Sequence, residues 1–285
     1  MSPFDTLTLR RTTGGLRVKR TNKTGFYRVT RRGPAVAILL CGMAVIALLT
    51  GLAGKAVQVA AQPARHPIYS VETPEKKVAL GINCAWDNED IERLLETLDQ
   101  YNVKASFFLV GDWCDRYPDS VRQIDAAGHE LGSHSDTHAD MTKLDREGIL
   151  REIRVSNEKI KALTGKSPTL FRPPSGAYNN QVIELIEAEG LFPIQWDCDS
   201  LDYRNLTPDE MQQRIFKKLR NGSILLFHSG AKYTPAALPQ IIEAIRGEGY
   251  DFVMVSELVH PRPYRVDFEG RQHPVKQNQD TSKTN

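Results

Sequence analysis

The strongest constraint on the fold of this chain is an alternation of short apolar runs with helical patterns. Amphipathic spacing such as Ile91, Leu94, Leu95 and Leu98 separates the runs, and Thr207-Pro208-Asp209-Glu210 predicts a helix start with a capping box. Strands that alternate with helices favour a parallel sheet, so we expect an α/β fold, a distorted (β/α)7 barrel, with a doubly wound open sheet as the alternative. The seven candidate strands are Val78–Ile82, Val103–Val110, Glu130–Ser133, Thr169–Phe171, Phe192–Trp196, Ser223–Phe227 and Phe252–Val255.

The N-terminal end has a different composition from the rest. Residues 1–33 hold nine Lys and Arg against one Asp, whereas the remainder holds 28 basic and 34 acidic residues. A nucleic-acid-binding domain would be basic, so the charge distribution argues against a nucleic-acid partner.

Residues 34–54 form a segment of 21 residues without a charge, about the length that crosses a bilayer. Basic residues crowd its N-terminal side, which predicts a single-pass cell-membrane protein with a cytoplasmic N-terminus and the folded domain outside. Cleavage of a signal peptide near Val59-Ala60-Ala61, which would release a secreted domain, is the alternative.

Composition also suggests the domain boundaries. We expect a basic cytoplasmic tail over residues 1–33, a transmembrane helix over 34–54, a proline-containing linker over 55–76, one domain over 77–260 and a polar tail over 261–285. The tail has no apolar periodicity, so no further domain is predicted there.

Polar side chains follow six of the seven apolar runs. In barrels and in open sheets alike, functional residues gather at the carboxyl ends of parallel strands, which makes these residues the candidates for an active site. In chain order they are Asn83 and Cys84, Asp112, His134 and His138, Arg172, Asp197 and Asp199, and His228.

His134 and His138 stand four residues apart directly after a predicted strand. One helical turn would aim both imidazoles at a single ion. Zinc held by imidazoles lowers the pKa of a bound water to about 7, which suits a hydrolase. Two unrelated surface histidines are the alternative.

Arg172 is followed by two rigid prolines and then by Gly176, which suggests a fixed arginine, although a loop salt bridge would give the same pattern. His228 ends an apolar strand and is a candidate proton donor to a leaving amine, with a packed core histidine as the alternative. Asp199 and Asp202 either orient that imidazole or cap the next segment.

Taken together and in this order, these pieces resemble the polysaccharide deacetylases with a NodB-homology domain, carbohydrate esterase family four, over about residues 77–258. The family's His-Ser-x-x-His motif matches His134–His138, and its Arg-Pro-Pro-x-Gly motif matches Arg172–Gly176. The Asp-x-x-Asp-Trp region matches Asp199–Tyr203, and Leu-x-His matches Leu226 and His228. The run Ala85–Asp90 looks like the sporulation-type branch.

The resemblance implies metal-assisted removal of acetyl groups from an N-acetylated glycan, such as peptidoglycan or a chitin-like polymer. It implies a divalent metal, zinc first, with cobalt or another ion as alternatives. It also gives catalytic roles to His228, Arg172 and Asp199, and places Leu226, Tyr203 and the backbone N–H of Ser175 near the substrate or its oxyanion.

The first motif departs from the family, in which Thr-Phe-Asp-Asp supplies a general base and then a metal ligand. Gly81-Ile82-Asn83-Cys84 stands there instead, and a carboxamide cannot accept a proton at neutral pH. Cys84 is either a third ligand in a Cys-His-His site or a packed thiol, with the metal then held by two histidines and waters. Arg172, which pairs with the aspartate in the family, loses that partner here.

We therefore expect a membrane-anchored, extracytoplasmic, metal-dependent N-deacetylase of cell-wall polysaccharide. The alternatives are a catalytically impaired glycan-binding or cell-wall assembly protein on the same fold, and an O-acetyl esterase. The choice between an active enzyme and a binding protein depends on Asn83.

Overall fold

The structure, a computed structural model, describes residues 18–21, 26–29 and 63–275. The chain divides into two compact units, residues 1–63 and 64–285. In the first unit, β1 (Val18–Thr21) and β2 (Phe26–Val29) form an antiparallel pair. The predicted membrane span over residues 34–54 lies outside the described residues.

The prediction of a fold with a transmembrane helix is corrected here. Across residues 18–21, 26–29 and 63–275, no helix combines the length and the apolar character needed to cross a bilayer. The longest described helix, α5 (Arg146–Thr164), has 19 residues but carries charged side chains along its length. The single-pass membrane localisation rested on such a helix and is corrected with it.

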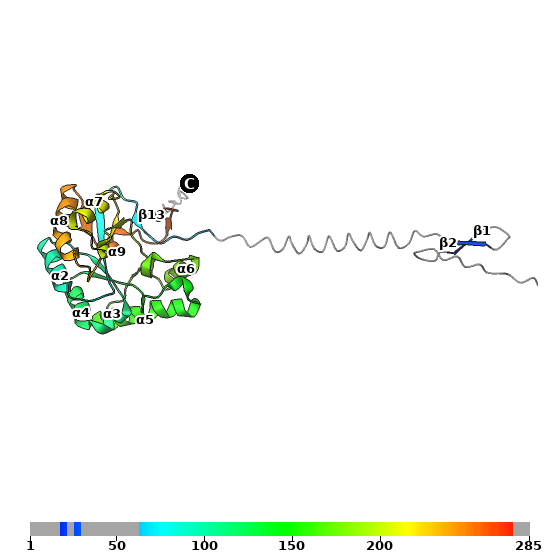
Figure 1. Cartoon of the computed structure of the whole chain (residues 1–285), viewed down its shortest axis with the longest axis horizontal. Helices are drawn as coiled ribbons and strands as arrows, with labels where there is room; N and C mark the ends of the chain where they lie inside the picture. Colours follow the sequence, from blue (N-terminus) through cyan, green and yellow to red (C-terminus); the bar gives the residue numbers. More distant parts are fainter. Residues whose placement is uncertain (1–17, 22–25, 30–62, 276–285) are drawn as a thin grey trace, which may run out of the picture. The chain divides into compact units, whose positions relative to one another are not determined.

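A curled, all-parallel sheet forms the centre of the second unit (Figure 1). One strand of this sheet, β11 (Asp251–Val253), pairs with the first half of β4 (Lys77–Cys84), on the same edge that β5 (Ser106–Leu109) occupies further along. The other strands, in spatial order, are β8 (Phe192–Pro193), β7 (Leu170–Phe171), β6 (Glu130–Ser133), β5 (Ser106–Leu109), β4 (Lys77–Cys84), β10 (Ile224–His228) and β9 (Cys198–Asp199).

The strand order follows the chain around the sheet, as in a barrel, and shows no switch point of the doubly wound kind. Each of the seven predicted runs overlaps a strand. The sheet nevertheless stays open, because β8 and β9 do not pair with each other. β9 was not predicted, since two residues that pair only with β10 leave no periodic signal.

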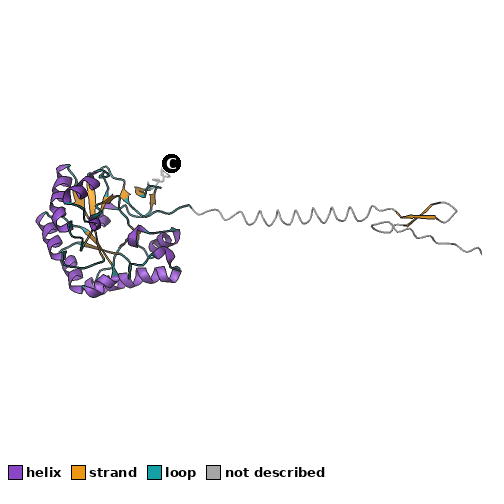
Figure 2. Ribbon diagram, in the orientation of Figure 1, coloured by secondary structure: helices purple, strands orange, loops and turns teal. Residues whose placement is uncertain are grey.

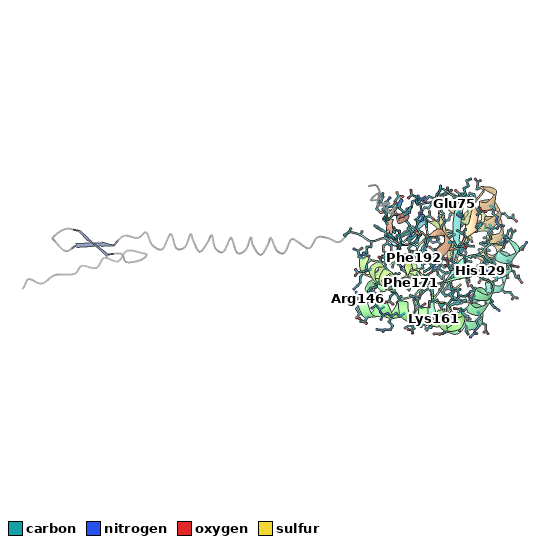
Figure 3. The ribbon with its side chains drawn as sticks, turned by 180° about the vertical axis from the view of Figure 1, so that it is seen from behind. Glu75, His129, Arg146, Lys161, Phe171 and Phe192 are labelled. Atoms are coloured by element: carbon teal, nitrogen blue, oxygen red, sulfur yellow. The ribbon has the colours of Figure 1, made fainter. Side chains whose placement is uncertain are left out.

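Helices surround the strands on the outside (Figure 2). The capping box is confirmed at the start of α7, where Thr207 and Glu210 exchange side-chain and backbone hydrogen bonds. Figure 3 shows Phe171 and Phe192, which lie on the neighbouring strands β7 and β8. The remaining helices are α2 (Ile91–Gln100), α3 (Gly111–Arg116), α4 (Pro118–Ala126), α6 (Asn180–Ala188), α7 (Pro208–Phe216), α8 (Thr234–Gly247), α9 (Val255–Leu258) and the short 3-10 helices η1 (Met141–Lys143), η2 (Pro174–Gly176) and η3 (Asp202–Arg204).

The open side of the sheet is covered by a closing segment, Ile68–Val71, which the sequence suggested was part of a linker. Ile68 donates its backbone N–H to the carbonyl of Pro193 at the end of β8 (2.8 Å), and Val71 donates to the carbonyl of Gly222 just before β10 (2.9 Å). The side chains of Ile68 and Val71 are fully buried in the inner hydrophobic cluster, together with Phe108. An open parallel sheet leaves its inner face exposed, so this segment completes the core.

The predicted polar tail also contributes structure. β12 (Tyr264–Val266) and β13 (Arg271–Pro274) form an antiparallel pair, and β13 also pairs in parallel with β3 (Ser70–Val71). These strands are too short to show apolar periodicity in the sequence.

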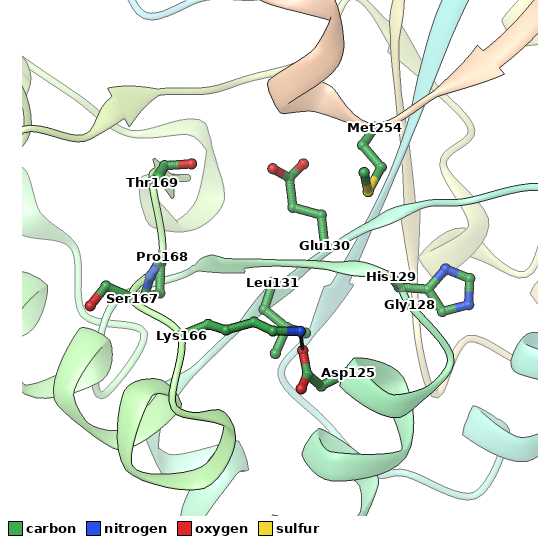
Figure 4. Close-up of a pocket in the computed structure, with 10 residues that line it drawn as sticks. All are labelled: Asp125, Gly128, His129, Glu130, Leu131, Lys166, Ser167, Pro168, Thr169 and Met254. Carbon is green, nitrogen blue, oxygen red and sulfur yellow. Dashed lines mark hydrogen bonds and ion pairs between the residues drawn. The ribbon is translucent and has the colours of Figure 1, made fainter.

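A cavity of about 290 Å³ opens at the amino-terminal end of β6, where His129 lies in its wall (Figure 4). The His129 ring is buried, and its Nδ1 accepts the backbone N–H of Ala105 at 3.2 Å. Burial, helped by the charge of Lys104, lowers the pKa of His129 to about 4.

We expect this buried imidazole to make the protein sensitive to acid. An unfolded histidine titrates near 6.5, so the unfolded chain binds the proton first and stability falls as the pH drops from about 6.5 to about 4. The full effect is about 3 kcal/mol. Denaturant unfolding of wild type and His129→Gln at pH 7 and pH 4 should show a smaller loss in the variant. An equal loss in both would contradict this assignment.

Candidate functional site

Arg172 lies at the centre of the sheet's carboxyl end, with its side chain fully buried. Its Nη1 donates to Oδ1 of Asn83 at 2.7 Å, and its guanidinium lies 3.7 Å from the centroid of the Phe108 ring. Burial lowers the pKa of Arg172 to about 9, against the opposing effect of the Asp199 carboxylate. The arginine is thus a buried cation whose hydrogen-bonded side-chain partner is neutral.

Two residues that the sequence analysis missed support this arginine. A Cβ at Gly81 would lie 2.6 Å from Nη2 of Arg172, so β4 needs a glycine there for the guanidinium to enter. A glycine inside an apolar strand is a sequence signal of such a close approach. The backbone carbonyl of Gln195 accepts from Nη2 at 3.4 Å, and nothing in the sequence marks that contact.

His134 and His138 lie together, with ring centroids 4.9 Å apart and ring planes at 81°. Nδ1 of His134 is 2.7 Å from the carbonyl oxygen of Arg172, which suits an Nδ1–H donor and leaves Nε2 free as a ligand. Desolvation lowers the pKa of both imidazoles, that of His134 strongly, and the nearby His228 adds to this effect. Both rings are therefore neutral at neutral pH, the form that binds metal.

A loop, and not the expected helical turn, brings the two histidines together. Ser135 and His138 have φ angles of 68° and 60°, which no helix contains, and Oγ of Ser135 accepts the His138 N–H at 3.0 Å. Glu152 on α5 accepts the backbone N–H groups of Asp136 and Thr137 at 3.0 and 2.9 Å. Glu152 thereby fixes the loop, a role that its position in mid-helix did not suggest.

The Cys-His-His metal site is not formed. Cys84 and Asn83 are consecutive on β4, so they point to opposite faces of the sheet, and Cys84 is fully buried in the outer hydrophobic cluster beneath the helices. Burial raises the pKa of the Cys84 thiol well above its usual value. Within residues 63–275, no group of three His, Cys, Asp or Glu side chains is placed to hold a metal. Of the three candidate ligands, only His134 and His138 lie together.

We expect His138→Ala to weaken binding of Zn²⁺ by more than about 100-fold, since even a change behind a metal ligand costs 10- to 100-fold. Competition with a metal indicator dye measures the affinity. His260→Ala, which removes an imidazole bonded to the carbonyl of Glu72, is the matched control and should bind zinc like the wild type. Equal affinity in His138→Ala would place the metal elsewhere.

His228, at the end of β10, is held by Asp202. Nδ1 of His228 lies 2.8 Å from Oδ1 of Asp202, whose other oxygen accepts the His228 N–H (2.6 Å) and the Thr234 hydroxyl (2.7 Å). Asp202 is fully buried. Asp199 instead accepts the backbone N–H of Leu201 at 2.9 Å. Of the two candidate aspartates, therefore, Asp202 orients the imidazole, whereas Asp199 makes only a local bond two residues along the chain.

Aromatic rings flank His228 on two sides. Trp86 stacks on the imidazole at 5.2 Å between centroids, and Tyr203 meets it edge-on at 5.4 Å. Leu226, two residues earlier on β10, is fully buried below them. Ser175 is exposed directly after Pro174, with a left-handed φ of 54°.

Comparison with known proteins assigns a family to this architecture. Residues 70–193 match the family model described as polysaccharide deacetylase. The chain is 35% identical over 194 residues to the uncharacterized protein YlxY of Bacillus subtilis, across 68% of this chain and 60% of YlxY. It is 30% identical to a peptidoglycan-N-acetylglucosamine deacetylase of Bacillus cereus, across 70% of this chain and 95% of that protein.

Among solved structures, the chain resembles BA3943 of Bacillus anthracis, described as a CE4 family pseudoenzyme. The identity is 34% and the TM-score 0.66, with 67% of this chain and 68% of BA3943 covered. A mutant of BA3943 is described as having restored enzymatic activity.

Proposed function

Because this chain belongs to the polysaccharide deacetylase family, we propose that it binds N-acetylated cell-wall glycan at the strand-end site and that its own hydrolytic activity is strongly impaired. We infer the substrate class from the peptidoglycan-N-acetylglucosamine deacetylase of Bacillus cereus, because the chain covers 95% of that protein. The chain spans 60% of the length of YlxY, so the proposal concerns the domain that they share.

The observation that carries the proposal is the contact between Asn83 and Arg172. The carboxamide stands where the family has its general base, and its Oδ1 accepts a hydrogen bond from the guanidinium at 2.7 Å. A carboxamide has no basic atom at neutral pH, and a fully buried Arg172 cannot take the proton in its place. Water at this site would therefore lack a base.

The remaining residues would serve to bind the glycan and to donate a proton to the leaving amine. His134 and His138 would hold a divalent ion, which supplies Lewis-acid polarisation of the acetyl carbonyl when bound. His228, oriented by the buried Asp202, is able to donate a proton to a departing amine. The backbone N–H of Ser175 and the exposed ring of Tyr203 would contact the acetamido group and the sugar.

A working N-deacetylase is the second candidate. It is favoured by the intact His228–Asp202 pair, because a protein that only binds glycan has no need of an oriented proton donor.

Binding and hydrolysis can be separated with the full-length protein. Calorimetric titration with β-1,4-linked N-acetylglucosamine oligomers should show binding that de-N-acetylated oligomers do not reproduce. With added Zn²⁺, acetate release should equal that of a His228→Ala variant, which lacks the proton donor. Release clearly above that variant would support the deacetylase instead, and absence of binding would contradict both candidates.

A further inference from the structure

Trp86 is an exposed aromatic residue beside His228, within the run Ala85–Asp90 and outside the four motifs that gave the site residues. Four large apolar side chains are exposed within residues 63–275: Trp86, Tyr203, Phe268 and Val275. Two of the four, Trp86 and Tyr203, converge on His228. Isolated exposed apolar residues are ordinary, but two that meet at one catalytic imidazole point to a ligand.

The backbone on both sides of Trp86 is held in place. The carbonyl of Ala85 accepts from Nη2 of Arg116 at 3.0 Å, and the carbonyl of Asp87 accepts the indole N–H of Trp113 at 3.0 Å. Because the residues before and after Trp86 are anchored to α3, the ring stands on a fixed support. It needs little ordering when a ligand binds.

One face of the Trp86 ring is covered and the other is available. The ring planes of Trp86 and His228 lie within 21° of each other, so the imidazole covers one face of the indole. Trp86 still exposes 44% of its surface. The face of the indole turned away from His228 can account for this exposure. A flat apolar surface of this size suits the C–H face of a pyranose ring.

We propose that Trp86 is a stacking platform for the sugar next to the reacting one in a bound glycan chain. A ring on the outer face of Trp86 is separated from His228 by the indole itself, so it is not the sugar whose acetamido group faces the histidines. The inference rests on the proposed function for the identity of the glycan, and it adds that the site recognises an oligomer through Trp86.

The test compares ligands of different length on the full-length protein. In calorimetric titrations, Trp86→Ala should weaken binding of N-acetylglucosamine tetramer about tenfold, the loss of one aromatic stacking contact. Binding of the monomer should not change. Trp86→Phe should retain most of the tetramer affinity, because it keeps an aromatic face.

Phe268→Ala provides the matched control. Phe268 is 83% exposed in the turn between β12 and β13, whose sheet meets the amino-terminal end of β10, away from His228. This variant should bind both ligands like the wild type. Unchanged tetramer affinity in Trp86→Ala, or an equal loss for monomer and tetramer, would overturn the platform while leaving the proposed function standing. A wild type that binds no oligomer would overturn both.

Discussion

Asn83→Asp is expected to raise acetate release from N-acetylated oligomers by about 10² to 10⁴, the usual contribution of a general base. The new carboxylate would stand 2.7 Å from Nη1 of Arg172, where the carboxamide oxygen lies now. The guanidinium would keep it ionised, because a nearby positive charge lowers the pKa of a carboxyl group. Acetate release with added Zn²⁺ measures the gain.

Asn83→Leu is the matched control, since it has a similar shape but no basic atom, and it should gain nothing. A second readout is stability: Asn83→Asp gives the buried Arg172 a charged partner and should not unfold the protein. If the wild type already hydrolyses the oligomers and Asn83→Asp is no faster, the base lies elsewhere. Asp87 and Asp199 would then be the residues to substitute.

Gly222→Ala is expected to destabilise the protein by about 3 kcal/mol or more. Gly222 has φ +80°, and a Cβ there would lie 1.8 Å from the carbonyl oxygen of Val71. The closing segment must then move away from β10, which opens the inner core. At about 2 to 4 °C per kcal/mol for a domain of this size, the melting temperature should fall by about 6 to 12 °C.

Gly165→Ala is the control that separates the strain of a positive φ from the clash with Val71. Gly165 has a similar φ of +76°, but a Cβ there would meet no atom within 4 Å. Only the strain of a left-handed alanine remains, about 1 to 2 kcal/mol. A Gly222→Ala variant no less stable than Gly165→Ala would show that the closing segment is not held against β10.

Local sequence patterns predicted most of the elements. The seven apolar runs became strands and Thr207 became a capping residue, because each depends on neighbours a few positions away. The closing segment could not be found in this way, since Ile68 and Val71 are buried by strands far along the chain.

The site was predicted as a set of residues but not as a set of contacts. His134, His138, Arg172 and His228 were identified because they follow strands. The choice between Asp199 and Asp202 could not be made from the sequence, as both carboxylates lie in the same short segment. The choice between a ligand and a packed thiol at Cys84 also stayed open, because the alternation of side chains along β4 is only decided once its inner face is known.

The pairing of β3 with β13 has a consequence for how the second unit folds. Near this pairing, His273 contacts the Glu72 carboxylate across 201 residues of sequence, at 2.7 Å. Contacts between such distant positions require a large loop to close, and a high contact order slows folding. During synthesis from the N-terminus, β3, the first strand of this unit, must wait for β13, its last described strand. The parallel sheet can assemble during that time, but the separate sheet of β3, β12 and β13 is completed only when the chain has emerged to about residue 274.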